Sequence, residues 1–272
     1  MTEKIVYTSG SPLREPGTFI RAAARDLRRA IPLGGRIAGA NLRARFRRTW
    51  LGWIWLFLPA AATTVVAVYV VGRRLLQLPA TDIPYPAFVL AGLLLWQVFA
   101  EALSAPLGQL QGARHVITRS TVPHEAFLIG AAIETLVNGA ARLAVGIPVL
   151  IALGAAPDWS LLWLPAALLA LTVFGLSVGL LVAVPGLLYE DVARLLLIGT
   201  GLWLFLSPVF YPVGGLLEWN PVAPLLDGAR AAMTGGALPP SFAIAAAGAT
   251  LLLLPVWLLY RVARPHLVAA LG

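Results

Sequence analysis

Long apolar stretches separated by short polar segments dominate this chain. The first, residues 51–72, contains no charged side chain, and as a helix it would extend about 33 Å, enough to cross the hydrocarbon core of a bilayer. Five more apolar stretches follow, at about 84–110, 127–153, 161–185, 192–207 and 242–260. The pattern predicts an all-α membrane protein with six transmembrane helices.

Residues 18–31 show the spacing of an amphipathic helix, with arginines on one face. Its apolar face is formed by Phe19, Ala23, Leu27 and Ala30. Such a helix either lies in the headgroup layer or packs on the protein's own cytosolic side, and the arginines favour the headgroup layer. Pro32 and Gly34–Gly35 predict a break after it. We therefore expect a cytosolic tail with an interfacial helix, residues 1–35, followed by a six-span permease domain, residues 36–272.

Residues 208–236 are apolar but are interrupted by several prolines and glycines. Irregular backbone is tolerated at membrane depth only where protein or water satisfies its hydrogen bonds. This segment therefore predicts re-entrant helices that enter the outer face between spans five and six and then return.

Composition supports a membrane location. The chain is 59% hydrophobic and only 12% charged, whereas about a quarter of an ordinary soluble domain is charged. There is no cysteine and the three histidines are scattered, so the sequence offers no disulfide framework, no thiol nucleophile and no metal cluster.

Basic residues set the predicted orientation. The stretch NLRARFRRTWLGWIW, residues 41–55, places arginines directly before tryptophans, as at a membrane boundary. A nucleic-acid arm could use the same residues, but it would not continue into 22 apolar positions. If the N-terminus is cytosolic, most of the 20 Lys and Arg residues are cytosolic as well. Both termini are therefore predicted on the cytosolic side of the inner (plasma) membrane.

The sequence lacks a nucleotide-binding loop. That motif needs a lysine after a glycine-rich turn, and Lys4 is the only lysine in the chain. We expect no cofactor and no catalytic residue on this chain. If the protein uses ATP, the ATP and its Mg²⁺ must be bound by a partner ATPase.

Aromatic residues cluster at two places. Phe46, Trp50, Trp53 and Phe57 are spaced four, three and four apart, so they share one face if the helix is continuous. They form either a membrane-interface belt or a stacking surface for sugar rings. A second group, near the outer end of the fifth span, could complete such a path and consists of Trp203, Phe205, Phe210 and Tyr211.

Ionisable residues inside predicted spans form the next signal. Glu134, Asn138 and Arg142 recur every four residues on the third span, and Glu101 lies in the second. Charges at such depth usually pair with one another inside a bundle. Pairing is favoured here over a proton relay, which would instead suggest an ion-coupled carrier.

Several motifs together resemble the permease subunits of ABC type-2 exporters for O-antigen, capsule and teichoic-acid chains. In order along the chain they are RARFRRTWLGWIWLFLP, PYPAFVLAGLLLWQVF, VPHEAF, YEDV, SPVFYP and WNPVAPLLDGAR. The resemblance covers most of residues 36–236. It implies a homodimer bound to two copies of a separate ABC ATPase.

The resemblance also implies roles for individual residues. Arg45, Arg47 and Arg48 would border a lateral entrance for a lipid-linked headgroup. Spans one and five would line the channel, and residues 208–236 would form its outer gate. The loop 111–127 would contact the ATPase through residues that include Arg114, Arg119, Pro123, His124 and Glu125.

The function predicted from the sequence is export of a lipid-linked polysaccharide across the inner membrane, with membrane lipid and glycan as ligands and without nucleic acid. One alternative is an ABC type-2 exporter of small amphiphiles or drugs. The other is an ion-coupled carrier that uses Glu101, Glu134 and Arg142.

Overall fold

A computed structural model describes residues 16–47, 50, 52–73, 81–119, 122–212 and 214–271. Every regular element in these ranges is helical. The elements are α1 Pro16–Phe46, α2 Ile54–Gly72, α3 Tyr85–Gly112, α4 Arg114–Arg119, α5 Glu125–Ala152, η2 Trp159–Trp163, α6 Leu164–Leu188, α7 Glu190–Phe205, η3 Gly215–Trp219, α8 Ala223–Thr234 and α9 Pro240–Leu271. The prediction of an all-α fold is confirmed for this part of the chain.

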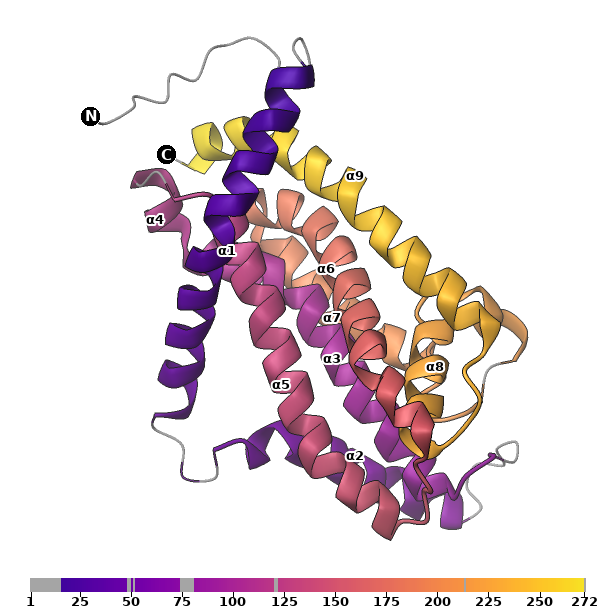
Figure 1. The fold of residues 1–272 in the computed structure, drawn as a ribbon. Coiled ribbons are helices and arrows are strands. Elements are labelled where there is room, and N and C mark those ends of the chain that lie inside the picture. The colour runs from indigo at the N-terminus through magenta and orange to yellow at the C-terminus, as the bar shows by residue number, and fades with distance from the viewer. Residues whose placement is uncertain are drawn as a thin grey trace.

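The central helix of the bundle is α3, which packs against α5 and α6, while α9 covers α6 (Figure 1). An aromatic group stabilises this centre: the Phe99 ring stacks on Phe174 with centroids 5.8 Å apart and contacts Trp96 at 5.2 Å. The α3–α6 contact is very close, because a Cβ on Gly179 would lie 2.2 Å from the carbonyl oxygen of Leu103. Only glycine allows the two backbones to approach this far.

Five of the described helices are long and apolar enough to cross a membrane. They are Ile54–Gly72, Tyr85–Gly112, Glu125–Ala152, the continuous segment Trp159–Leu188, and Pro240–Leu267. The multi-pass prediction is thus supported. The expected fifth span corresponds to α7, whose 16 residues extend only about 24 Å, so the count of six stays a prediction.

The expected break at Pro32 is wrong, because α1 continues through Pro32 and Gly34–Gly35 to Phe46. Packing explains the continuity. Gly34 lies so close to α5 that a Cβ there would be 2.7 Å from Ile129 Cγ2. Gly34, one of the residues that interrupt the sequence pattern, lets α1 lie close against α5, so tertiary contact overrides helix propensity.

The apolar face of the amphipathic segment of α1 packs on the protein, since Ala23 and Ala30 are buried. Figure 1 shows α1 running beside α5 rather than away from the bundle. The packing alternative is therefore present in the structure. A position in the headgroup layer stays a prediction.

A shared aromatic face required a helix that continues across the first aromatic row, and this condition is not met. The chain leaves α1 after Phe46, bends at Trp50 and turns at Gly52, whose φ of +49° is a left-handed conformation that favours glycine. Because α2 begins only at Ile54, the four aromatic residues do not share one helical face.

Two short helices occupy the broken segment, η3 and α8. The buried residues of α8 include Leu225, Leu226 and Met233. Ser160, in the η2 helix after α5, donates a hydrogen bond to the Ala232 carbonyl, which ties α8 to the end of the bundle where α5 finishes. Short helices in this segment were predicted; their re-entrant placement in a membrane stays a proposal.

Candidate functional site

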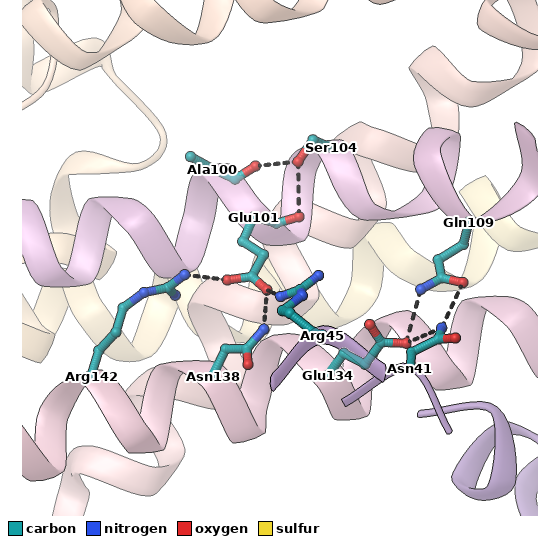
Figure 2. A network of polar contacts seen from close by, with 9 residues as sticks. All are labelled: Asn41, Arg45, Ala100, Glu101, Ser104, Gln109, Glu134, Asn138 and Arg142. Atoms are coloured by element: carbon teal, nitrogen blue, oxygen red, sulfur yellow. Dashed lines mark hydrogen bonds and ion pairs between the residues drawn. The ribbon is translucent and has the colours of Figure 1, made fainter. Parts of the chain in front are cut away.

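A polar network connects α1, α3 and α5 where the three helices face one another, and its members range from buried Asn138 to half-exposed Arg45 (Figure 2). Its centre is the carboxylate of Glu101 on α3. Asn138 and Arg142 stand one turn apart on α5, so both reach this carboxylate: the amide of Asn138 donates to Oε1 and the guanidinium of Arg142 donates to Oε2. Arg45 of α1 adds a third contact, with Nη1 3.6 Å from Oε1.

A second carboxylate, Glu134, lies on the same face of α5 and is 5% exposed. Its Oε1 accepts hydrogen bonds from the amides of Asn41 at 2.7 Å and Gln109 at 2.9 Å. The two acids and the two arginines of the network carry opposite charges in equal number. A neutral set of this kind lowers the cost of placing charges inside a membrane.

A polar pocket of about 380 Å³ adjoins both carboxylates. Its polar lining residues are Arg45, Glu101, Ser104, Gln109, Glu134 and Thr135. Several buried atoms nearby lack a hydrogen-bond partner among the described residues: Thr135 Oγ1, Asn138 Oδ1 and Nε and Nη1 of Arg142. Of these residues Thr135 lines the pocket, and buried polar atoms normally find a partner, so the pocket can accept a small polar group such as water or a hydroxyl next to Thr135.

The structure therefore brings together all four predicted buried polar residues, together with Arg45. Sequence reasoning missed Asn41 and Gln109. A signal was present, since Asn41 precedes Arg45 by four residues and Gln109 follows Glu101 by eight, which places each pair on one helical face. Pairing, which was favoured over a proton relay, is observed between Glu101 and Arg142.

A second charged cluster joins α1, α5 and α9 near both ends of the chain. Arg261 donates to Asp26 at 2.8 Å and to Glu125, and Arg264 lies 3.7 Å from Glu125. Next to it, His124 Nδ1 and the Tyr260 hydroxyl are 2.9 Å apart. Burial, together with Arg264 and Arg261, lowers the pKa of His124 to about 3, so the imidazole is neutral at physiological pH.

This cluster corrects part of the predicted ATPase contact. His124 and Glu125 are only 3% and 2% exposed, so their side chains hold α5 to α9 and do not form a docking surface. Arg114 is exposed on α4 and Pro123 is half-buried. The side chain of Arg119 lies outside the described residues. Sequence reasoning missed Asp26, whose role depends on a contact between chain positions far apart.

The predicted channel residues divide into two environments. Trp50 is 99% exposed, and Trp53 is also exposed. Trp203 is bound into the protein: its ring meets Phe99 edge-on at 5.1 Å, and its Nε1 donates to Asn220 Oδ1 at 3.1 Å.

The remaining predicted residues that the structure describes are exposed or half-buried. Phe205 stacks on Phe210 at 5.7 Å, and Phe57 and Tyr211 are half-buried. Arg47 is exposed, whereas Arg48 lies outside the described residues.

No family model matches this chain. It is 25% identical over 229 residues to the O-antigen export system permease protein RfbA of Myxococcus xanthus, covering 78% of this chain and 85% of the relative. It is 24% identical over 204 residues to the polysialic acid transport protein KpsM of Escherichia coli, covering 72% and 79%. A third relative, RfbA of Klebsiella pneumoniae, is 19% identical over 210 residues, covering 74% and 80%. The resemblance seen in the sequence motifs is confirmed.

Proposed function

We propose that this chain, a relative of ABC type-2 polysaccharide-export permeases, is the membrane subunit of an exporter that moves a lipid-linked polysaccharide across the inner membrane. Two copies of the chain form the pathway. Two copies of a partner ABC ATPase bind ATP and Mg²⁺ and supply the energy. Both termini lie on the cytosolic side, and six helices cross the membrane, with α7 as the fifth.

One observation carries this proposal: the match to export permeases extends over more than 70% of this chain and of each relative. A match of that extent includes the apolar helices and is not confined to one motif. The sequence has no nucleotide-binding lysine motif, which fits a subunit that depends on a partner for energy.

The burial pattern supports a homodimer. Only Ala60 and Thr64 of α2 are buried, and no residue of α7 is buried. Large apolar side chains project from both helices, for example Val65 at 70% exposure and Leu197 at 77%. These helices correspond to the first and fifth spans, which resemble channel-lining helices, so their open faces are available to a second copy as well as to lipid.

Within this pathway, Arg45, Arg47 and Arg48 attract the phosphate-bearing headgroup at the lateral entrance. Exposed Trp53 and half-buried Phe57 provide apolar ring surfaces for sugars. The α4 segment carries the cytosolic contact with the ATPase, and η3 with α8 forms the outer gate.

A candidate of a different class is an ion-coupled carrier, and one observation favours it: the hydrogen bonds described for Glu134 come from two neutral amides. Transport into inverted vesicles containing the chain distinguishes the two. We expect glycan uptake to require the ATPase partner and ATP and to persist when the proton gradient is collapsed. Uptake driven by a proton gradient in the absence of ATP, and lost in Glu134→Gln, would establish the carrier instead.

The same vesicles test the substrate class. Lipid-linked glycan should stimulate ATP hydrolysis, whereas small cationic or neutral amphiphiles should not. Stimulation by small amphiphiles alone would identify an exporter of that class.

A further inference from the structure

An apolar cavity of about 330 Å³ lies between α5, α6 and α9. None of its lining residues belongs to the polar network around Glu101. Apart from Glu125 and Thr250, the lining side chains are apolar, and α1 contributes Leu27 to the wall. The cavity is therefore separate from the proposed substrate entrance at Arg45 and has a different chemistry.

The surroundings of the cavity indicate what fills it. The helices α5, α6 and α9 all belong to candidate membrane spans, and the rim is open, with Leu254 57% exposed. In a bilayer the medium at this rim is hydrocarbon. Water gains little in an apolar space, and an empty space would cost the lining residues their dispersion contacts. A hydrocarbon chain from the bilayer satisfies both conditions.

One end of the cavity lies at a polar boundary. Glu125 and Trp257 line this end, and the guanidinium of Arg261 lies 5.7 Å from the centroid of the Trp257 ring while it pairs with Glu125. Arg261 also pairs with Asp26, the neighbour of Leu27. This ion cluster holds α1 across the end of the cavity, where a lipid headgroup would begin.

The charge on α1 selects the headgroup. Arg25, Arg28 and Arg29 are exposed around Leu27, and Asp26, the acidic residue among them, is already bonded to Arg261. Clustered arginines on an amphipathic helix attract anionic lipids. We propose that this cavity binds one acyl chain of an anionic membrane phospholipid whose phosphate contacts the arginines of α1. This lipid is a resident component of the protein and not its transported substrate.

Binding of dioleoyl phosphatidylglycerol to the purified full chain after delipidation tests this site, with dioleoyl phosphatidylcholine as the zwitterionic comparison. Ala132→Phe places a ring in the cavity and Thr250→Phe fills it from the exposed rim. Ala140→Phe is the matched control, since Ala140 is exposed on α5 and does not line the cavity. Each protein is first checked for a single monodisperse species by gel filtration.

We expect tightly retained phosphatidylglycerol, seen by native mass spectrometry, to be lost in both filling variants and kept in Ala140→Phe. Arg25→Gln with Arg28→Gln should weaken retention about fivefold per arginine and remove the preference over phosphatidylcholine. The proposal is overturned if the filling variants retain as much lipid as the control, or if the wild-type protein shows no preference for the anionic lipid. Displacement of the bound lipid by an isoprenoid-linked glycan at equal concentration would assign the cavity to the substrate and also overturn it.

Discussion

Arg142 on α5 and Glu101 on α3 form an ion pair between two membrane-spanning helices, and both belong to one network with Arg45 of α1. The pair links the helix that lies at the centre of the bundle to the helix against which α1 packs. Arg142 is 7% exposed, so its charge depends on this partner. Substitutions of Arg142 and Glu101 therefore test how much this ion pair contributes to stability.

Replacing Arg142 with methionine should destabilise the protein strongly. The change leaves the Glu101 carboxylate, which is 20% exposed, with Asn138 and the half-exposed Arg45. An uncompensated buried charge costs about 3–5 kcal/mol, so with these partners left we expect a loss of about 2–3 kcal/mol. The free energy of unfolding in detergent, from urea or thermal denaturation, measures this. The double variant Glu101→Gln/Arg142→Met should recover most of the loss, since the charge that remains, on Arg45, is half-exposed to solvent; a double variant as unstable as the sum of the single ones would show that the pair is not coupled.

Gly179→Ala should destabilise the protein by about 1–3 kcal/mol, because the new methyl group would collide with the Leu103 carbonyl and separate α6 from α3. Gly199→Ala on α7 is the matched control: a Cβ there meets no atom within 4 Å, so alanine's helix propensity should leave stability unchanged or slightly raised. Melting temperatures of the two variants in the same detergent give the comparison. Equal melting temperatures would contradict the close packing of α3 and α6.

The sequence pattern identified the helices that are apolar over a full membrane thickness, because length and hydrophobicity are local properties. It also picked out Glu101 and Arg142 as charges that pair within the bundle, without naming their partners, since charges in apolar stretches must pair. It failed where contacts between distant segments decide the structure. Pro32 and Gly34 suggested a break, yet contact with α5 keeps α1 continuous.

Exposure was a second property that the sequence could not provide. Glu125 lies in a polar segment, which predicts a cytosolic surface position. In the structure Glu125 is buried and pairs with Arg261 of α9, which is distant in the sequence. Trp203 similarly lies near the end of a predicted span, where the sequence predicts a ring facing the path. In the structure its Nε1 donates to Asn220 and its ring packs on Phe99. Such partners become visible only once the helices are placed together.

Trp53 and Trp203 should respond differently to alanine substitution. Trp203→Ala removes the contacts with Phe99 and the bond to Asn220, so it should lower the unfolding free energy by about 2–4 kcal/mol. Trp53 is 38% exposed, so Trp53→Ala should lower the melting temperature less than Trp203→Ala does and reduce glycan export if sugars stack there. Export and melting temperature are measured on the same preparations; Trp53→Phe, which keeps a ring, should restore export.

Acidification should weaken the junction between α5 and α9. The ordinary pKa of histidine is 6.5, and burial with Arg264 and Arg261 lowers that of His124 to about 3 in the folded protein. Between pH 6.5 and 3, His124 is therefore protonated in the unfolded chain but neutral in the folded chain. The contribution of neutral His124 to the free energy of unfolding is fully present above pH 6.5 and is lost as the pH falls towards 3. At pH 5 the loss from this residue alone is about 2 kcal/mol.

His124→Gln can keep a polar partner for Tyr260 but does not titrate, and its unfolding free energy should change less than that of the wild type between pH 7.5 and 5. Identical pH profiles for the two proteins would show that His124 is not held neutral in this junction.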